Sequence, residues 1–142
     1  MKKAAVLGGV RIPFSRSMGK YMGVSNQELM SASVESLVER FQLQNKKLGE
    51  VVLGAVIKHS ADWNLAREVT MGSGLCKSTP AYDIQQACGT SLEAAILIAN
   101  KIKLGQADSG IAGGTDTNSD LPIVFGKKFR RQMLESYKGR DL

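Results

Sequence analysis

The sequence predicts an α/β layered fold in which strands and helices alternate along the chain. Three observations support this prediction. Short apolar or β-branched runs alternate with stretches of helical spacing, two of the runs end in Gly-Gly, and no internal repeat or low-complexity segment interrupts the pattern. The expected order is β-α-β-α-β-α-β, which is typical of a sheet covered by helices with right-handed connections.

The first two expected elements are a strand and a helix. Residues 4–9 form a short apolar run that ends in Gly-Gly ahead of Pro13, so we expect a buried strand there. Ser25 and Glu28 have the spacing of a capping box, which marks a helix N-terminus. This helix is expected to end within residues 45–49, where lysines and a glycine provide stop signals. Its apolar positions are Met30, Val34, Leu37, Val38 and Phe41.

The remaining elements continue the alternation. They are expected to be a strand at 50–57, a short helix at 65–72, a strand at 81–86, a helix at 88–103 and a strand at 108–114. Residues 50–57 are rich in β-branched and apolar side chains, which suits a strand covered on both faces. Gly105 stands where the C-terminal cap of the helix at 88–103 is expected. The apolar stripe of that helix is expected to comprise Leu92, Ala95, Ile96, Ala99 and Ile102.

Length and composition fit one soluble globular domain. The chain has 142 residues, of which 43% are hydrophobic and 23% charged, and these values are ordinary for such a domain. No apolar run approaches the ~18–20 residues needed to span a bilayer. The apolar part of residues 1–11 is too short for a signal peptide and is broken by glycines. We therefore expect a cytoplasmic protein without an integral membrane segment.

Cysteine and histidine are scarce, which limits the chemistry available. Cys76 and Cys88 do not form a disulfide framework, and with His59 as the only histidine they cannot supply a four-ligand zinc site. No metal site is therefore expected. His59 is the only local general-base candidate, but its loop position favours a polar or interface role. Cys76 lies in a loop at the end of a helix, and we expect it to be structural.

The positive charge is concentrated at the end of the chain. Residues 127–142 hold six basic and two acidic residues, in a chain whose net charge is +6. Such a segment suits phosphates, nucleic acid or an anionic membrane surface, and it equally suits a solvated helix face. No aromatic stacking platform accompanies it in the sequence pattern, so nucleic acid is the least favoured partner.

Cys88 is the strongest candidate for chemistry because it stands between a predicted strand and a predicted helix N-terminus. Free backbone N–H groups and the helix dipole favour a thiolate at such a position, and the same N–H groups can hold a developing oxyanion. Gly89 permits a tight turn, and the small side chains of Ala87, Thr90 and Ser91 leave room for an acyl group. The local pattern also fits a small cysteine buried at a helix start, and by itself it does not decide between the two interpretations.

Three ordered motifs across the chain resemble the thiolase family. Residues 86–94, Gln-Ala-Cys-Gly-Thr-Ser-Leu-Glu-Ala, resemble the family's active-site turn, in which the cysteine is the catalytic nucleophile. Residues 10–14, Val-Arg-Ile-Pro-Phe, and 111–116, Ile-Ala-Gly-Gly-Thr-Asp, resemble two elements that flank it. The resemblance implies a thiolase-like layered fold with helices packed on a mixed sheet. It further implies an N-terminal domain at residues 1–118 and the truncated start of a loop domain at 119–142.

One departure indicates a branch of the family. Many thiolases have glycine where this chain has Ser91, and the variant is more similar to the fatty-acid-oxidation β-subunit branch. Residues 121–134 also resemble that branch. The resemblance implies CoA thioesters as substrates, no bound cofactor, a homo-oligomer and a β-oxidation α-subunit as a partner. It assigns no CoA-contacting residue here. Residues Lys127–Arg131 could contact the phosphates of CoA, and they equally suit a solvated segment.

The resemblance also implies a reaction. Cys88 would attack a 3-ketoacyl-CoA and release acetyl-CoA, after which CoA would take the acyl group, and the reverse is a Claisen condensation. Family members also need a histidine and a second cysteine that lie beyond this chain, so the fragment is expected to be inactive alone. Two alternatives stay open: a 3-ketoacyl synthase, which pairs the cysteine with two histidines, and a non-catalytic fragment or interaction module.

Overall fold

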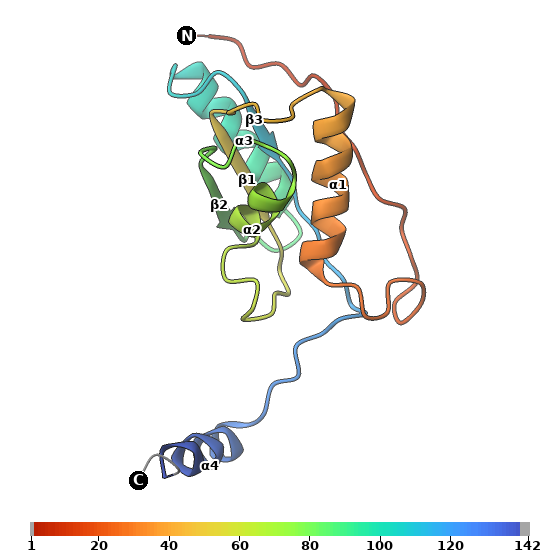
Figure 1. Cartoon of the computed structure of the whole chain (residues 1–142), viewed down its shortest axis with the longest axis vertical. Helices are drawn as coiled ribbons and strands as arrows, with labels where there is room; N and C mark the ends of the chain where they lie inside the picture. Colours follow the sequence, from red (N-terminus) through yellow and green to blue (C-terminus); the bar gives the residue numbers. More distant parts are fainter. Residues whose placement is uncertain (1, 140–142) are drawn as a thin grey trace.

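A parallel three-stranded sheet forms the centre of the molecule, and the computed structural model describes residues 2–139 (Figure 1). The strands have the order β2-β1-β3, and both pairs are parallel. The elements are α1 Asn26–Arg40, β1 Glu50–Gly54, α2 Leu65–Gly72, β2 Ala81–Ile84, α3 Thr90–Lys103, β3 Gly110–Ala112 and α4 Lys127–Lys138. Strands and helices alternate as the sequence predicts, with one exception at the N-terminus.

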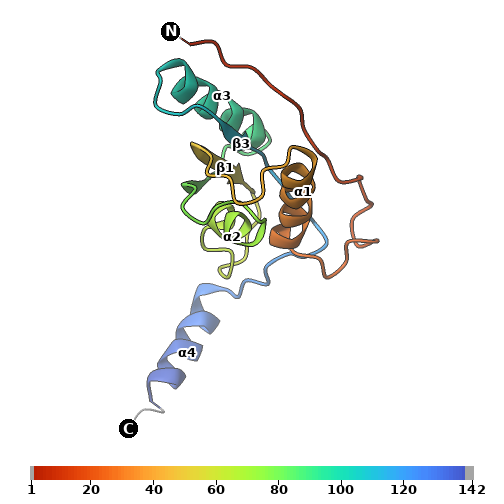
Figure 2. The same ribbon diagram turned by 45° about the horizontal axis from the view of Figure 1, so that its top comes forward.

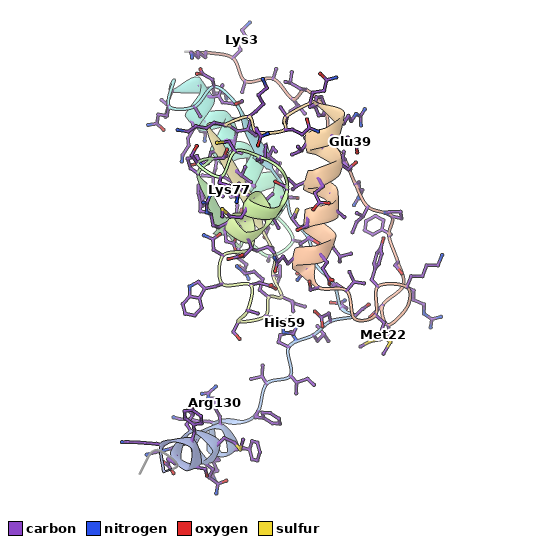
Figure 3. All side chains as sticks on the ribbon, in the orientation of Figure 1. Lys3, Met22, Glu39, His59, Lys77 and Arg130 are labelled. Carbon is purple, nitrogen blue, oxygen red and sulfur yellow. The ribbon has the colours of Figure 1, made fainter. Side chains whose placement is uncertain are left out.

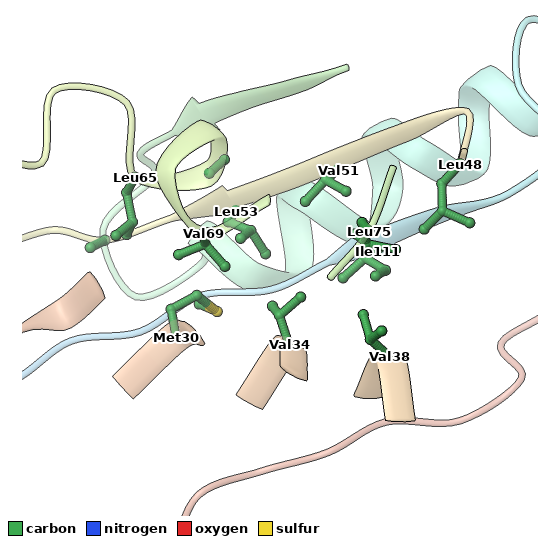
Figure 4. Packing of buried hydrophobic residues seen from close by; sticks show 12 residues of the cluster. Met30, Val34, Val38, Leu48, Val51, Leu53, Leu65, Val69, Leu75 and Ile111 are labelled. Atoms are coloured by element: carbon green, nitrogen blue, oxygen red, sulfur yellow. The ribbon is translucent and has the colours of Figure 1, made fainter. Parts of the chain in front are cut away.

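Helices cover the sheet on both faces, which confirms the α/β layered class. Helices α1 and α2 pack on one face, and α3 packs on the other (Figure 2). The α1/α2 side holds the larger apolar cluster, whose buried members include Met30, Val34, Val38, Leu65 and Val69 (Figure 4). The α3 side is held by Val52, Ala94 and Ile98. The core is therefore divided by the sheet into two layers of unequal size.

Strand β1 is the central strand, and its side chains reach both layers. Val51 and Leu53 point into the α1/α2 cluster, whereas Val52 points toward α3. All three are fully buried. This alternation follows from the period of two along a strand, and it explains why the sequence of β1 is apolar on both faces.

Helix α1 begins where its capping box predicts. The Ser25 hydroxyl accepts from the Glu28 N–H, and the Glu28 carboxylate accepts from the Ser25 N–H. The same bonds hold the pKa of the Glu28 carboxyl below its ordinary value. The helix ends at Arg40, earlier than residues 45–49, because Gln42 and Asn45 have left-handed backbone angles that a helix cannot continue through.

The predicted strand at residues 4–9 is wrong for the described chain. This segment is extended, but it pairs with no strand, and Val6 and Leu7 are 94% and 85% exposed. A groove of about 660 Å³ separates residues 3–8 from β3 and α3, so no strand lies within hydrogen-bonding distance. This segment is tied near both ends. Lys2 pairs with Asp108 at 2.7 Å and its N–H donates to the Lys103 carbonyl, and the Gly9 carbonyl accepts from the Arg40 guanidinium at 3.2 Å. The three described strands form a parallel sheet, not the mixed sheet that the resemblance implies.

The predicted apolar stripe of α3 is only partly correct. Ala94 and Ile98 face the sheet with Leu97 and Ile102 beside them, whereas Leu92 is 66% exposed. Gly105 has the left-handed φ of +72° expected after a helix end. Helix α3 is apolar around most of its circumference, a pattern typical of a helix with a second buried face. Its outer apolar residues are Leu92, Ala95, Ile96 and Ala99.

Helix α4 stands apart from the layered domain (Figure 1). None of its residues is buried, and the segment from Leu121 to Phe125 that leads to it has no regular structure. Residues 119–142 therefore include a helix that does not share the core of the domain.

The uncovered outer face of α3 should make the chain self-associate. Exposed apolar surface of this kind favours contact between molecules. We expect Leu92→Glu combined with Ile96→Glu to shift the chain toward monomer in sedimentation velocity. Asn100→Glu is the matched control, because it adds a carboxylate to the same helix at an exposed polar position. Equal association of the wild type and the double variant would contradict this role of the face.

Candidate functional site

The carboxyl ends of the three parallel strands meet at one edge of the sheet. Strand β1 leads into residues 55–59, β2 leads into residues 85–89, and β3 leads into residues 113–120. In open α/β sheets, ligands bind outside this edge. Cys88 lies in the segment that follows β2.

A tight turn carries Cys88 from β2 into α3. The Gly89 N–H donates to the Gln86 carbonyl at 2.9 Å, which closes the turn. Ala87 has a φ of +45°, in the left-handed region that costs a non-glycine residue about 1 kcal/mol or more. The residue immediately before the candidate nucleophile is therefore strained.

Thr90 holds this strained turn in place. Its hydroxyl donates to the Ala87 carbonyl at 2.8 Å and accepts from the Gln86 N–H at 2.9 Å. Thr90 is itself buried, so both bonds are partly shielded from water. Each such bond contributes about 1 kcal/mol, enough in sum to offset the strain at Ala87.

Cys88 is exposed and lies one residue before Gly89, the N-cap of α3. No side chain caps this helix, so the N–H groups of its first turn have no side-chain acceptor, although the Thr90 N–H donates to the Ala87 carbonyl. The exposed position differs from the buried structural cysteine that the local sequence also allowed. It leaves the sulfur accessible to an acyl donor.

The turn lies directly on Gly54, the last residue of β1. A methyl group at Gly54 would collide with the Ile84 carbonyl oxygen and with the Thr90 methyl group. No larger residue fits there unless the backbone moves. The glycine therefore allows β1, β2 and the start of α3 to approach closely beneath Cys88.

The segment after β3 is tied to the same place. The Thr115 N–H donates to the Gly54 carbonyl at 3.0 Å. The Asp116 carboxylate accepts from the N–H groups of Val56 and Ile57 at 2.9 to 3.1 Å. A side chain at Gly114 would press on Ser91 in the first turn of α3, so the second glycine of residues 113–114 serves close packing. Three separate loops are thereby held together at the Cys88 edge.

Asp83 connects β2 to the neighbouring helix and loop. Its carboxylate accepts from the N–H groups of Leu65 and Ala66 at the start of α2, at 2.9 and 2.5 Å. It also pairs with the Lys58 ammonium at 2.6 Å. Negative charge at a helix N-terminus is favourable, so Asp83 fixes α2 and residue 58 relative to the strand that leads to Cys88.

The structure brings two of the three sequence motifs into one cavity. Residues 10–14 and 111–116 both line a space of about 370 Å³ against α1. The Cys88 turn does not line it and lies on the surface instead. The contact between Gly114 and Ser91 is what connects the third motif to the other two.

His59 and Cys76 contact residues that do not belong to the Cys88 turn. His59 Nε2 is 3.2 Å from both the carbonyl and a carboxylate oxygen of Asp120, beside the segment that leads to α4 (Figure 3). Cys76 Sγ is 3.1 Å from the Ser78 hydroxyl. Hydrogen bonds with Ser78 lower the pKa of the Cys76 thiol. Among the described residues, neither side chain forms a hydrogen bond with Cys88.

Two kinds of feature are absent from residues 2–139. No group of three or more histidine, cysteine, aspartate or glutamate side chains is placed to hold a metal ion. No helix in this range has both the length and the apolar content required to cross a membrane.

Comparison with known proteins decides the family. A family model described as "Thiolase, N-terminal domain" matches residues 4–141, nearly the whole chain. The chain belongs to the thiolase family. A 3-ketoacyl-CoA thiolase of Shewanella pealeana is 36% identical over 141 residues, which are 99% of this chain and 32% of that protein. A 3-ketoacyl-CoA thiolase of Shewanella halifaxensis is 35% identical over 140 residues, with the same coverage.

A solved structure supports the thiolase fold. The acetyl-CoA acetyltransferase of Bacillus anthracis superposes with a TM-score of 0.84 at 26% sequence identity, covering 90% of this chain and 32% of that one. The thiolase-like fold class is thereby confirmed. This thiolase chain spans about a third of the length of the curated relatives it matches, 32% in each case described above.

Sequence reasoning did not assign roles to Thr90, Asp83 or Asp116. Thr90 was noted only as a small residue, although a hydroxyl two positions after the cysteine is a signal for a side-chain-to-backbone bond. Asp83 stands between apolar residues of the strand, and a partly buried acid in such a position needs hydrogen-bond donors nearby. Asp116 belongs to one of the three motifs, but local sequence spacing cannot predict its hydrogen bonds to Val56 and Ile57, which lie about 60 residues earlier.

The exposed Cys88 should react faster with iodoacetamide than Cys76. Cys76 is half-buried, and its lowered pKa partly offsets this by raising the thiolate fraction at neutral pH. Ser78→Ala removes the side-chain hydrogen bond, the largest cause of the lowered pKa, and keeps the backbone one, so Cys76 should have less thiolate and react more slowly. Cys88 should be unaffected. Peptide mass spectrometry over a labelling time course measures both rates, and equal or reversed rates in the wild type would argue against an accessible thiolate at α3.

Proposed function

We propose that this chain is the N-terminal part of an acyl-CoA C-acyltransferase, with Cys88 as the acyl-accepting nucleophile. The proposed reaction is 3-ketoacyl-CoA and CoA to acyl-CoA and acetyl-CoA, or the reverse condensation. The observation that carries the proposal is an exposed cysteine on a strained turn at an uncapped helix N-terminus, in a chain of the thiolase family. The names of its relatives, 3-ketoacyl-CoA thiolase and acetyl-CoA acetyltransferase, support the substrate class.

The proposed first step transfers an acyl group to sulfur. The Cys88 thiolate attacks the 3-keto carbon, a carbon–sulfur bond forms, and the bond between carbons 2 and 3 breaks. The released acetyl-CoA carbanion takes a proton from an acid, which in the family is a second cysteine outside this chain. The N–H groups at the start of α3 would interact with negative charge near the sulfur, and the absence of a side-chain cap on this helix supports that role.

The proposed second step regenerates the thiol. The CoA thiolate attacks the acyl carbon, the carbon–sulfur bond to Cys88 breaks, and acyl-CoA leaves. The small residues around the turn, Ala87 and Gly89, leave this bond accessible. In the reverse direction, acetyl-Cys88 would accept a second acetyl-CoA carbanion.

Several features of the whole protein belong to the same proposal. Residues 1–118 would be the first half of the thiolase fold, and residues 119–142 would begin its loop domain. The intact protein would act as a homo-oligomer, with a β-oxidation α-subunit as a partner and CoA thioesters as substrates without a bound cofactor. A cytoplasmic location stays a prediction. The separation of α4 from the layered domain supports a boundary near residue 118.

Cys88 should accept an acetyl group from acetyl-CoA, and Cys76 should not. The reason is the accessibility of Cys88 and its place at a helix N-terminus. Incubation with acetyl-CoA followed by peptide mass spectrometry should place the acetyl group on Cys88. Cys88→Ala should abolish the adduct, and the matched variant Cys76→Ala should retain it. Acetylation that survives Cys88→Ala would remove Cys88 from the proposed mechanism.

The chain alone should not catalyse turnover of acetoacetyl-CoA and CoA. Its only histidine, His59, contacts Asp120. The resemblance implies that the second cysteine of the family lies beyond this chain, so Cys76 does not take that role. Loss of the ultraviolet absorbance of acetoacetyl-CoA measures thiolysis. Turnover by the pure chain at ordinary enzyme rates, about 1–10³ per second, would show that the machinery is complete without further residues.

A further inference from the structure

The hydroxyl of Thr90 holds two separate peptide groups of the turn that carries Cys88. It accepts from the Gln86 N–H at 2.9 Å and donates to the Ala87 carbonyl at 2.8 Å. The peptide group between these two is held by the backbone, because the Gly89 N–H donates to the Gln86 carbonyl at 2.9 Å. Three successive peptide groups that lead to Cys88 are therefore fixed in orientation, and the Thr90 side chain fixes two of them.

The last of these peptide groups determines where the Cys88 N–H points. In a planar trans peptide, the carbonyl and the N–H point in opposite directions. Since the Ala87 carbonyl points at the Thr90 hydroxyl, the Cys88 N–H of the same peptide points away from Thr90. This N–H has no backbone acceptor among residues 2–139. It is therefore a free donor on the same residue that carries the thiol.

The side chain of Thr90 provides the stronger hold on the Ala87 carbonyl. The Thr90 N–H donates to the same carbonyl at 3.2 Å, whereas the hydroxyl donates at 2.8 Å. Thr90 is only 4% exposed, so water competes little for its hydroxyl. Ala87 has a strained left-handed φ of +45°, so the turn gains by relaxing when this hold is lost. Removal of the hydroxyl should therefore let the peptide between Ala87 and Cys88 rotate.

We propose that Thr90 is a positioning residue for acyl transfer to Cys88, because its hydroxyl sets the direction of the free Cys88 N–H. The inference rests on the proposed function, in which Cys88 accepts an acyl group. The Cys88 thiolate attacks the carbonyl carbon of acetyl-CoA, a carbon–sulfur bond forms, and the carbonyl oxygen takes up negative charge. The carbonyl re-forms as the bond to the CoA sulfur breaks, and the CoA thiolate leaves. A donor that is correctly directed at the charged oxygen lowers the barrier of this step.

Alkylation by iodoacetamide provides a comparison that does not need such a donor. The same thiolate displaces iodide from a saturated carbon, and no negative charge develops on an oxygen bonded to that carbon. Acetylation should therefore depend on the direction of the Cys88 N–H, whereas alkylation should depend only on access to the thiolate. The ratio of the two rates at Cys88 distinguishes a misdirected N–H from a general loosening of the turn.

Thr90→Ala and Thr90→Ser form the test pair, since both lack the γ-methyl group and they differ only in the hydroxyl. Peptide mass spectrometry measures the rates at which acetyl-CoA and iodoacetamide modify Cys88 in the wild type and in both variants. We expect acetylation of Thr90→Ala to be about tenfold slower or worse, with alkylation close to the wild-type rate. Thr90→Ser keeps both hydrogen bonds, so it should be acetylated at close to the wild-type rate.

Thr70→Ala is the matched control for loss of a buried hydroxyl. Thr70 is fully buried in α2, and its hydroxyl donates to the Ala66 carbonyl at 2.7 Å, a bond that involves no residue of the Cys88 turn. This variant should leave both rates at Cys88 unchanged. Circular dichroism checks that each variant is folded, and Thr90→Val provides a second variant without the hydroxyl if Thr90→Ala does not fold.

Three outcomes would overturn the inference while wild-type Cys88 is acetylated. The first is a folded Thr90→Ala that is acetylated at the wild-type rate. The second is equal slowing of acetylation and alkylation in Thr90→Ala, which would limit Thr90 to supporting the turn as a whole. The third is a Thr90→Ser that is acetylated as slowly as Thr90→Ala. A wild-type Cys88 that is alkylated but not acetylated would instead contradict the proposed function, and the inference with it.

Discussion

The close approach at Gly54 is the constraint on which the candidate site depends. Because this residue has no side chain, the end of β1 lies against the Ile84 carbonyl and the Thr90 methyl group. Strand β2 can therefore leave the sheet and enter α3 within a few residues, and the turn that carries Cys88 stays close to the sheet. The Gly54 carbonyl also accepts from the Thr115 N–H, so one backbone position joins all three strand ends.

This packing gives the turn its chemical character. Ala87 stays in a strained left-handed conformation because the bonds of Thr90 to residues 86 and 87 hold it there. The strain is local, and its result is an exposed thiol beside an uncapped helix N-terminus. Asp83 and Asp116 contribute from below by fixing the neighbouring loops through backbone N–H groups. These contacts provide the surroundings that the proposed role of Cys88 requires.

Local patterns predicted most of the fold but not the features that depend on distant contacts. The capping box located α1, the apolar run located β1, and residues 65–72 were predicted as the helix that α2 forms. The run at 4–9 has a strand's composition but no partner strand in reach, because a groove separates it from β3. On α3, apolar residues surround the helix, so periodicity alone could not tell which side faces the sheet. Cys88 was predicted from its position between elements together with the resemblance of residues 86–94 to the family's active-site turn. The support from Gly54, Thr90 and Asp116 depends on three-dimensional packing.

The most direct test is the acetylation rate of Cys88 in a Gly54→Ala variant, compared with Gly72→Ala. A methyl group at Gly72 meets open space, so this control changes the same residue type without a collision. If packing at Gly54 holds the Cys88 turn in its reactive form, folded Gly54→Ala should transfer acetyl from acetyl-CoA to Cys88 about tenfold more slowly or worse, with Gly72→Ala unchanged. A folded Gly54→Ala that acetylates Cys88 at the wild-type rate would contradict the account.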